Sequence, residues 1–106
     1  MGYAKERGKL EKLLIKIVGL NTYEEKNLVI LNDSHEKYSH TIRILKNKEP
    51  DTFNELYKNE LQEIKTGKIA IKESDSDETR QDNFLKYKDI MIRAIEKTIQ
   101  TTNETN

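Results

Sequence analysis

Apolar residues in the first part of the chain recur at intervals of three and four, which is the spacing of one side of an α-helix. Within residues 4–19 this stripe consists of Leu10, Leu13, Leu14, Ile17 and Val18. Gly19 and Asn21 follow it, and both residue types tolerate the left-handed conformation that ends many helices. The pattern therefore predicts a first amphipathic helix over residues 4–19.

Residues 22–48 carry the longest regular pattern. Thr22 and Glu25 have the spacing of a capping box that opens a helix. The positions after it alternate at spacings of three and four and form a heptad seam: Leu28, Leu31, His35, Tyr38, Ile42 and Leu45. We favour one long helix that packs lengthwise against a partner. The alternative is two short strands near 28–31 and 41–45, because the polar residues between them favour a turn.

Pro50 interrupts this pattern, because the residue before a proline is disfavoured in the helical conformation. A third helix is predicted over residues 52–66, with Asp51 or Thr52 as its N-cap. Its inward positions are Phe53, Leu56, Tyr57, Leu61 and Ile64. Gly67 is expected just past its C-terminal end, where glycine is common.

The remaining residues predict a connection, a fourth helix and a tail. Residues 68–72 alternate in polarity, which indicates a short strand or an extended connector, and the acidic residues 73–78 indicate an exposed loop. A fourth helix is expected over about 79–100, with one apolar face made of Phe84, Tyr87, Met91, Ile92, Ile95 and Ile99. The polar residues 101–106 are expected to be frayed.

Together these elements predict a mainly α protein, a small three- to four-helix bundle with a long second helix. Residues 1–100 are expected to form a single helical domain, followed by a flexible polar tail over 101–106. The alternative is an α+β fold with short strands near 28–31, 41–45 and 68–72.

Composition narrows the class of protein but does not identify a function. The chain has 106 residues, zero net charge and 34% hydrophobic residues, which suits one small domain. The lack of cysteine excludes disulfides, thiolate metal sites and thiol catalysis. No apolar run predicts a membrane span or a signal peptide, so a cytoplasmic location is expected. The abundance of Lys, Ile and Asn, all read from A/T-rich codons, hints at an A/T-rich microbe or a mobile element.

No motif of known catalytic chemistry is present, and we predict neither an enzyme nor a cofactor. His35 and His40 are rotated by about 140° on a continuous helix, so they cannot share a metal ion there. Across a turn they could converge, with Asp33 or Glu36 as an oxygen ligand. The favoured interpretation makes His35 a polar seam residue, buried or at an interface, and no metal site is predicted.

The first helix carries a basic ridge beside its apolar stripe, formed by Lys5, Lys9, Lys12 and Lys16. These side chains lie within about 60° of one another at helical spacing. A ridge of this kind can contact nucleic-acid phosphates, an anionic membrane surface or an acidic protein. Tyr3 is the only aromatic residue nearby, so stacking on bases is not indicated.

The favoured function is that of a small non-enzymatic interaction protein, such as an adaptor, inhibitor, assembly factor or regulator, which binds another macromolecule. We expect a homodimer with a protein partner, because Ile44 and Ile90 lie outside the main apolar faces and would be costly to expose. No small-molecule substrate is evident. The alternative is a nucleic-acid-binding module that combines the basic ridge with Arg43, Lys46 and Lys48, although zero net charge counts against it.

Overall fold

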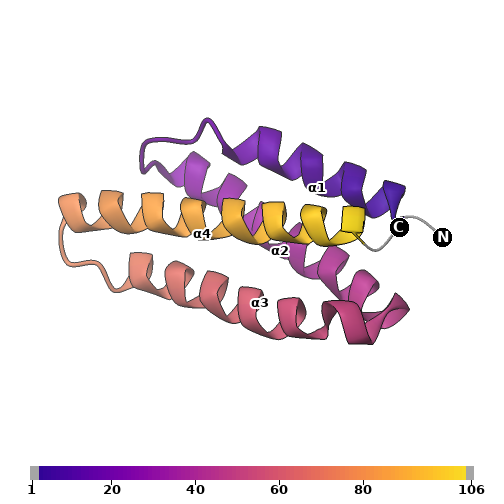
Figure 1. Ribbon diagram of the computed structural model, residues 1–106. Helices are drawn as coiled ribbons and strands as arrows, with labels where there is room; N and C mark the ends of the chain where they lie inside the picture. The colour runs from indigo at the N-terminus through magenta and orange to yellow at the C-terminus, as the bar shows by residue number, and fades with distance from the viewer. Residues whose placement is uncertain (1–2, 105–106) are drawn as a thin grey trace.

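The computed structural model describes residues 3–104, which fold into four α-helices and contain no strand (Figure 1). Helix α1 spans Ala4–Ile17, α2 spans Glu25–Lys48, α3 spans Pro50–Lys72 and α4 spans Asp77–Glu104. Consecutive helices run in opposite directions and pack against each other, and α1 also packs against α4. The predicted mainly α bundle is therefore confirmed, and the alternative α+β fold is wrong.

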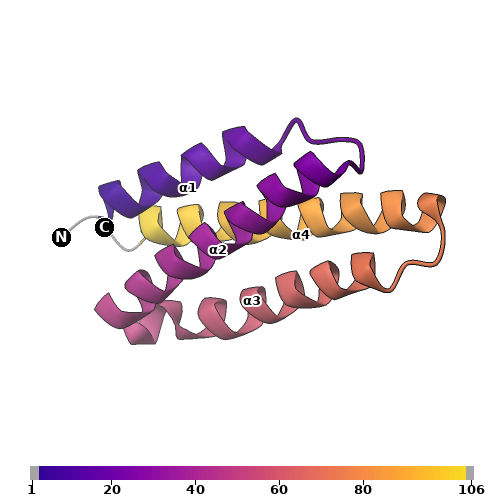
Figure 2. The same ribbon diagram turned by 180° about the vertical axis from the view of Figure 1, so that it is seen from behind.

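Helix α2 is the long second helix that the heptad seam predicted. It is continuous, and it crosses the bundle diagonally from the end of α1 to the start of α3 (Figure 2). The seam faces inward, and four of its members have no exposed surface: Leu31, Tyr38, Ile42 and Leu45. The lengthwise partner of α2 is the protein's own core, since α3 and α4 are long enough to cover the seam.

The capping box predicted for the second helix is not formed. Helix α2 begins at Glu25 with Glu24 as its N-cap, and no side chain accepts from its first N–H groups. The loop before it is held from α4 instead. The side chain of Gln81 accepts a hydrogen bond from the Tyr23 N–H at 2.6 Å and donates to the Asn21 carbonyl at 2.9 Å. Contacts between distant segments thus position this turn, where the sequence pattern suggested a local motif.

Helix α3 is longer than the sequence indicated, at both of its ends. Pro50 is its first residue, a position where the missing N–H of proline costs nothing. Glu49 is therefore the N-cap, in place of Asp51 or Thr52. Residues 68–72 form the last turns of α3, so the predicted strand or connector there is wrong.

Gly67 lies inside α3 and does not end it. A β-carbon added at this position would lie 3.3 Å from Ile90 Cδ1 and 3.4 Å from Tyr87 Cα, both on α4. Glycine therefore lets the backbones of α3 and α4 approach closely. This packing outweighs the helix propensity of glycine, which is about 1 kcal/mol less favourable than that of alanine.

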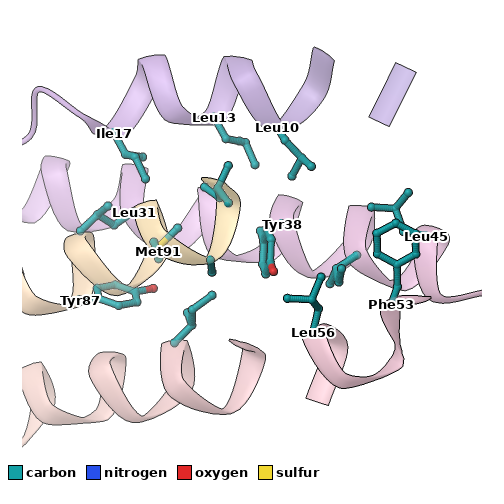
Figure 3. Packing of buried hydrophobic residues seen from close by; sticks show 14 of the residues in the cluster. Leu10, Leu13, Ile17, Leu31, Tyr38, Leu45, Phe53, Leu56, Tyr87 and Met91 are labelled. Carbon is teal, nitrogen blue, oxygen red and sulfur yellow. The ribbon is translucent and has the colours of Figure 1, made fainter. Parts of the chain in front are cut away.

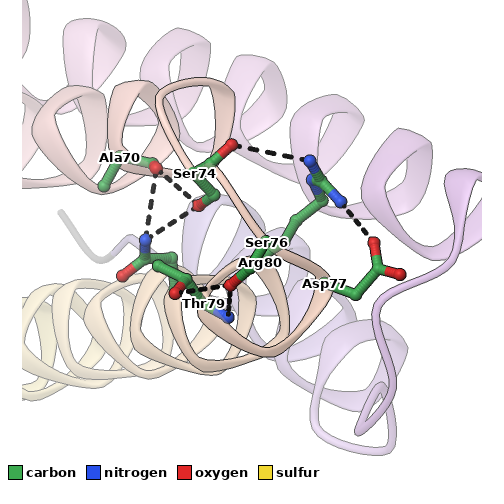
Figure 4. Close-up of polar contacts among 7 residues, drawn as sticks. Ala70, Ser74, Ser76, Asp77, Thr79 and Arg80 are labelled. Atoms are coloured by element: carbon green, nitrogen blue, oxygen red, sulfur yellow. Dashed lines mark hydrogen bonds and ion pairs between the residues drawn. The ribbon is translucent and has the colours of Figure 1, made fainter.

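The acidic segment between α3 and α4 is a short turn held by hydrogen bonds (Figure 4). Ser76 Oγ accepts from the Thr79 N–H at 3.1 Å, which satisfies one free donor in the first turn of α4. Asn83 Nδ2 donates to Ser74 Oγ at 2.9 Å. The exposed loop is confined to residues 73–76, because these bonds start the helix directly after it.

Helix α4 includes most of the segment predicted to be a flexible tail. It continues to Glu104, and Thr102 has no exposed surface. Arg7 of α1 donates to Thr102 from two nitrogens, Nε to Oγ1 and Nη2 to the carbonyl oxygen, each at 3.1 Å. The structure thus continues α4 through residues 101–104, where the sequence predicted a flexible tail, and the contact with Arg7 holds Thr102 against α1. Residues 105–106 of that prediction lie outside the described residues.

Side chains from all four helices meet in one core (Figure 3). Within it, the Tyr38 hydroxyl donates to Thr98 Oγ1 at 2.9 Å, and Thr98 donates to the Ala94 carbonyl at 2.8 Å. Burial raises the pKa of Tyr38, so this hydroxyl stays protonated. The chain of hydrogen bonds satisfies the polar groups that these two side chains bring into the core.

Candidate functional site

Three of the four lysines of the predicted basic ridge line a groove between α1 and α2, here termed the α1/α2 groove. Its volume is about 650 Å³, and its basic side chains come from both helices: Lys9, Lys12, Lys16, Lys37 and His40. Lys5 is exposed one turn earlier on α1 and does not line it. The structure therefore brings three of the four predicted lysines together with two basic residues of α2 that sequence reasoning did not connect with them.

The floor of the α1/α2 groove is closed by the core. Leu13 of α1 and Thr41 of α2 line the groove, but they are only 5% and 3% exposed. The methylene stems of the lysines therefore make up much of the walls, while their ammonium groups reach solvent. A groove of this kind offers an apolar surface below a row of positive charges.

The α1/α2 groove carries charges of both signs. Asp33 and Glu36 of α2 line it together with Lys37. Lys37 Nζ lies 3.1 Å from Asp33 Oδ2, and this contact raises the pKa of Lys37. None of the ion pairs in the described part of the chain involves the three α1 lysines of the groove. The α1 side therefore keeps positive charge that the fold does not neutralise.

The other cations considered for nucleic-acid binding are engaged within the fold. Lys48 Nζ lies 3.0 Å from Oε2 of Glu6, a carboxylate that is almost buried. Lys46 Nζ lies 4.4 Å from the ring centre of Tyr57. Arg43 lies close enough to the Tyr57 hydroxyl to lower the pKa of this group. These contacts tie α2 to α1 and α3, so the three cations are less available for a phosphate backbone.

Loss of the Lys48 contact is expected to change how stability depends on pH. Burial raises the pKa of Glu6. The hydrogen bond and charge of Lys48, together with a backbone hydrogen bond and the charge of Lys5, outweigh this effect, so the pKa lies below the ordinary value of 4.5. A carboxylate with a lowered pKa stabilises the fold above its ordinary pKa, and this contribution is lost as pH falls through the folded-state pKa. Lys48→Met should therefore lower the free energy of unfolding by about 1 kcal/mol at neutral pH.

Urea denaturation over a pH series measures this difference. It should vanish once the pH falls below the lowered pKa of Glu6, because the carboxyl is then neutral in both proteins. Lys86→Met on α4 removes an exposed charge and serves as the control, with little effect at any pH. A difference for Lys48→Met that stays constant with pH would contradict the assignment to Glu6.

The two histidines lie on different flanks of α2, as expected for a continuous helix. His40 is exposed in the α1/α2 groove. His35 is half-buried, and its ring meets the ring of Tyr87 edge-on with centroids 6.4 Å apart. The two histidines therefore cannot bind one ion together. Within residues 3–104, no three side chains of the metal-binding types are grouped to hold a metal ion.

A second groove, here termed the α2/α3 groove, lies on the flank of α2 that carries His35. Its volume is about 400 Å³, and its lining contains Lys65, Lys68 and Lys72 but no acidic side chain. Sequence reasoning missed it, because it assigned Lys65 to a helix and the other two lysines to a strand or connector. With residues 50–72 as one helix, the spacing of three and four residues places all three on one face.

The two isoleucines of the predicted interaction surface differ in burial. Ile90 is partly buried and packs on the core, with its Cδ1 close to Gly67. Ile44 remains partly exposed on α2. The largest exposed fractions among the large apolar side chains described are 77% for Ile15 and 65% for Val29. The structure thus keeps Ile44 at the surface and gives Ile90 a place in the contact between α3 and α4.

Both grooves present ammonium groups above methylene stems, a combination that can bind acidic ligands. No helix within residues 3–104 is both long enough and apolar enough to cross a membrane. Comparison with models of known families, with curated proteins and with solved structures finds no match for this chain.

Proposed function

We propose that this protein is a non-enzymatic interaction protein, of the adaptor, inhibitor, assembly-factor or regulator kind, which binds a segment of a protein partner in the α1/α2 groove. The observation that carries the proposal is the convergence of Lys9, Lys12 and Lys16 with basic residues of α2 around one groove. Two antiparallel helices with an apolar floor between them provide the surface on which an amphipathic partner helix can lie.

The mixed charge of this groove favours a protein over a nucleic acid. Asp33 and Glu36 stand on the α2 wall, where they would repel a phosphate backbone. A polypeptide can place acidic residues against the α1 lysines and basic or polar residues against α2. Charge complementarity of this kind gives specificity to protein interfaces. The zero net charge of the chain points in the same direction.

A synthetic amphipathic helix of about 20 residues, built from Glu, Ala and Leu, serves as the probe for this proposal. We expect it to bind more tightly than a DNA duplex of similar length at about 0.15 M salt. Lys12→Glu should weaken peptide binding about tenfold, because it replaces an attraction with a repulsion. Fluorescence anisotropy measures both affinities, and NMR shift changes locate the peptide on the protein.

Lys86→Glu is the matched control, because it makes the same change of charge at an exposed position on α4. Its effect on peptide binding should stay within about twofold, since the site is remote and screened by salt. Equal losses for Lys12→Glu and Lys86→Glu would contradict the groove as the binding site. Tighter binding of the DNA, with a steep loss as salt rises, would support the nucleic-acid-binding alternative instead.

We also propose that the protein forms a homodimer through the outer face of α2. Val29 and Ile44 are separated by about 60° around this helix, and both leave apolar surface exposed. We expect the protein to sediment as a dimer at high micromolar concentration, and Ile44→Asp to sediment as a folded monomer. Analytical ultracentrifugation with circular dichroism tests this expectation. Ile90→Asp, which alters the contact between α3 and α4, should lower stability instead. A monomeric wild-type protein would contradict the dimer.

A further inference from the structure

The α2/α3 groove differs in charge from the α1/α2 groove and shares no lining residue with it. Three lysines of α3 line it together with His35 and Ser39 of α2, and no carboxylate is present among the lining residues. An inference about this groove therefore goes beyond the function proposed above and can fail or succeed independently of it.

The lysines of this groove repel one another in the folded protein. Lys65 and Lys68 are three residues apart, and Lys68 and Lys72 are four apart, so like charges are neighbours on one face of α3. Like charges at these spacings destabilise a helix. No ion pair within residues 3–104 involves any of the three. An anion bound among them would relieve this repulsion.

His35 adds a half-buried hydrogen-bonding group to the lining. The Tyr87 hydroxyl donates to Asn32 Oδ1 at 2.9 Å, so its oxygen can accept from His35 Nδ1, which lies 3.4 Å away. Burial, and next the charge of Lys68, lowers the pKa of His35, while Glu36 on the same helix raises it. An anion in the groove would offset the first two effects and favour the imidazolium.

The groove also offers apolar surface beside its charges. Ile69 lines it and is 42% exposed, and Leu61 lines it and is partly buried. Its volume of about 400 Å³ lies within the range of pockets that hold small organic ligands. The most complementary ligand therefore carries several negative charges and an apolar part.

We propose that the α2/α3 groove binds a small organic polyphosphate, a compound that joins several phosphate groups to an apolar part. The three lysines span about 10 Å along α3 and contact the phosphates, since lysine binds phosphate as a point charge on a flexible stem. Ile69 and Leu61 contact the apolar part. The acidic side chains that would repel such a ligand in the α1/α2 groove are missing from this lining.

Magnesium-free ATP is the probe for this proposal, and inorganic tripolyphosphate is the matched probe without an apolar part. Isothermal titration calorimetry should show ATP binding that Lys68→Gln weakens about tenfold. Lys58→Gln, an exposed position on the same helix outside the groove, should change it by less than about twofold. Ile69→Ser should weaken the binding of ATP but not that of tripolyphosphate.

His35 provides a second readout that does not depend on calorimetry. Its imidazole proton shifts in NMR should show a higher pKa with ATP bound than without it, because the phosphates stabilise the imidazolium next to Lys68 and Tyr87. By linkage, ATP should bind more tightly as pH falls from 8 to about 7, a range in which the terminal phosphate of ATP stays largely ionised. A pKa of His35 that does not respond to ATP would place the ligand elsewhere and overturn the proposal.

Three further results would overturn the proposal. The first is a dissociation constant for ATP weaker than millimolar, the affinity expected of unspecific contacts. The second is equal weakening by Lys68→Gln and Lys58→Gln. The third is weakening by Lys12→Glu as large as that by Lys68→Gln, which would assign ATP to the α1/α2 groove. If tripolyphosphate binds as tightly as ATP, the proposal that the groove also recognises an apolar part of the ligand is wrong.

Discussion

Tyr38→Ala is expected to lower the free energy of unfolding by about 4 kcal/mol. Tyr38 has no exposed surface, and from α2 its hydroxyl reaches Thr98 on α4. Truncation removes the apolar contacts of the ring and leaves a cavity between helices that can close only in part. Urea denaturation followed by circular dichroism measures the loss, provided that the transition is two-state.

Two control variants separate the contributions of Tyr38. Tyr38→Phe keeps the ring and loses one hydrogen bond, which should cost about 1 kcal/mol because Thr98 still bonds to the Ala94 carbonyl. Ile15→Ala truncates an exposed side chain of α1 and should change stability by less than about 0.5 kcal/mol. If Tyr38→Ala costs no more than Tyr38→Phe, the ring is not part of a close-packed core.

Gly67→Leu is expected to lower the free energy of unfolding by about 3 kcal/mol. A β-carbon added at this position would already lie within 3.4 Å of the Tyr87 backbone and of the end of the Ile90 side chain. The longer leucine side chain must therefore push α3 and α4 apart, and these helices share the most extensive contact in the bundle. Thermal and urea denaturation measure the destabilisation.

The matched control for this prediction is Gly8, which also lies inside a helix but has open space around it. Gly8→Ala should stabilise the protein by about 0.5–1 kcal/mol, because alanine has the higher helix propensity. Gly67→Ala should be close to neutral, since the same gain is offset by the tight contact with Ile90. Similar losses for Gly67→Leu and Gly8→Leu would show that the contact between α3 and α4 is not the cause.

The diagonal course of α2 connects the fold with both candidate sites. Helix α2 crosses the bundle between α1 and α3 (Figure 2). Residues of α2 line one groove together with α1 and another together with α3. The two histidines of α2 lie in different grooves, His40 with the α1 lysines and His35 with the α3 lysines. Helix α2 therefore contributes lining residues to both proposed binding sites.

The sequence was most informative where one helix face is apolar over several turns. The seam from Leu28 to Leu45 predicted a long second helix, because residues at spacings of three and four share a face only in a helix. The same rule placed the α1 lysines beside the buried stripe, which is the edge that faces the α1/α2 groove. The basic ridge could thus be predicted, but not the residues of α2 that complete the groove.

Local signals were misleading wherever a distant contact outweighed them. Gly67 stands where the sequence predicted the end of a helix. In the structure it lies within α3, where it allows close packing against α4. Thr102 lies in a polar segment without an apolar pattern, yet Arg7 holds it against α1. Residues 68–72 alternate in polarity like a strand, although a helix at the edge of a bundle can show the same short alternation.

The sequence by itself determined the helical class, the inward face of α2 and the basic ridge of α1, because these depend on periodicity within one segment. The tertiary structure alone decided the lengths of α3 and α4, the helical conformation of residues 101–104 and the existence of the α2/α3 groove. Those features depend on which segments pack together, and a helix boundary moves when burial against a neighbour outweighs the weak preferences of single residues.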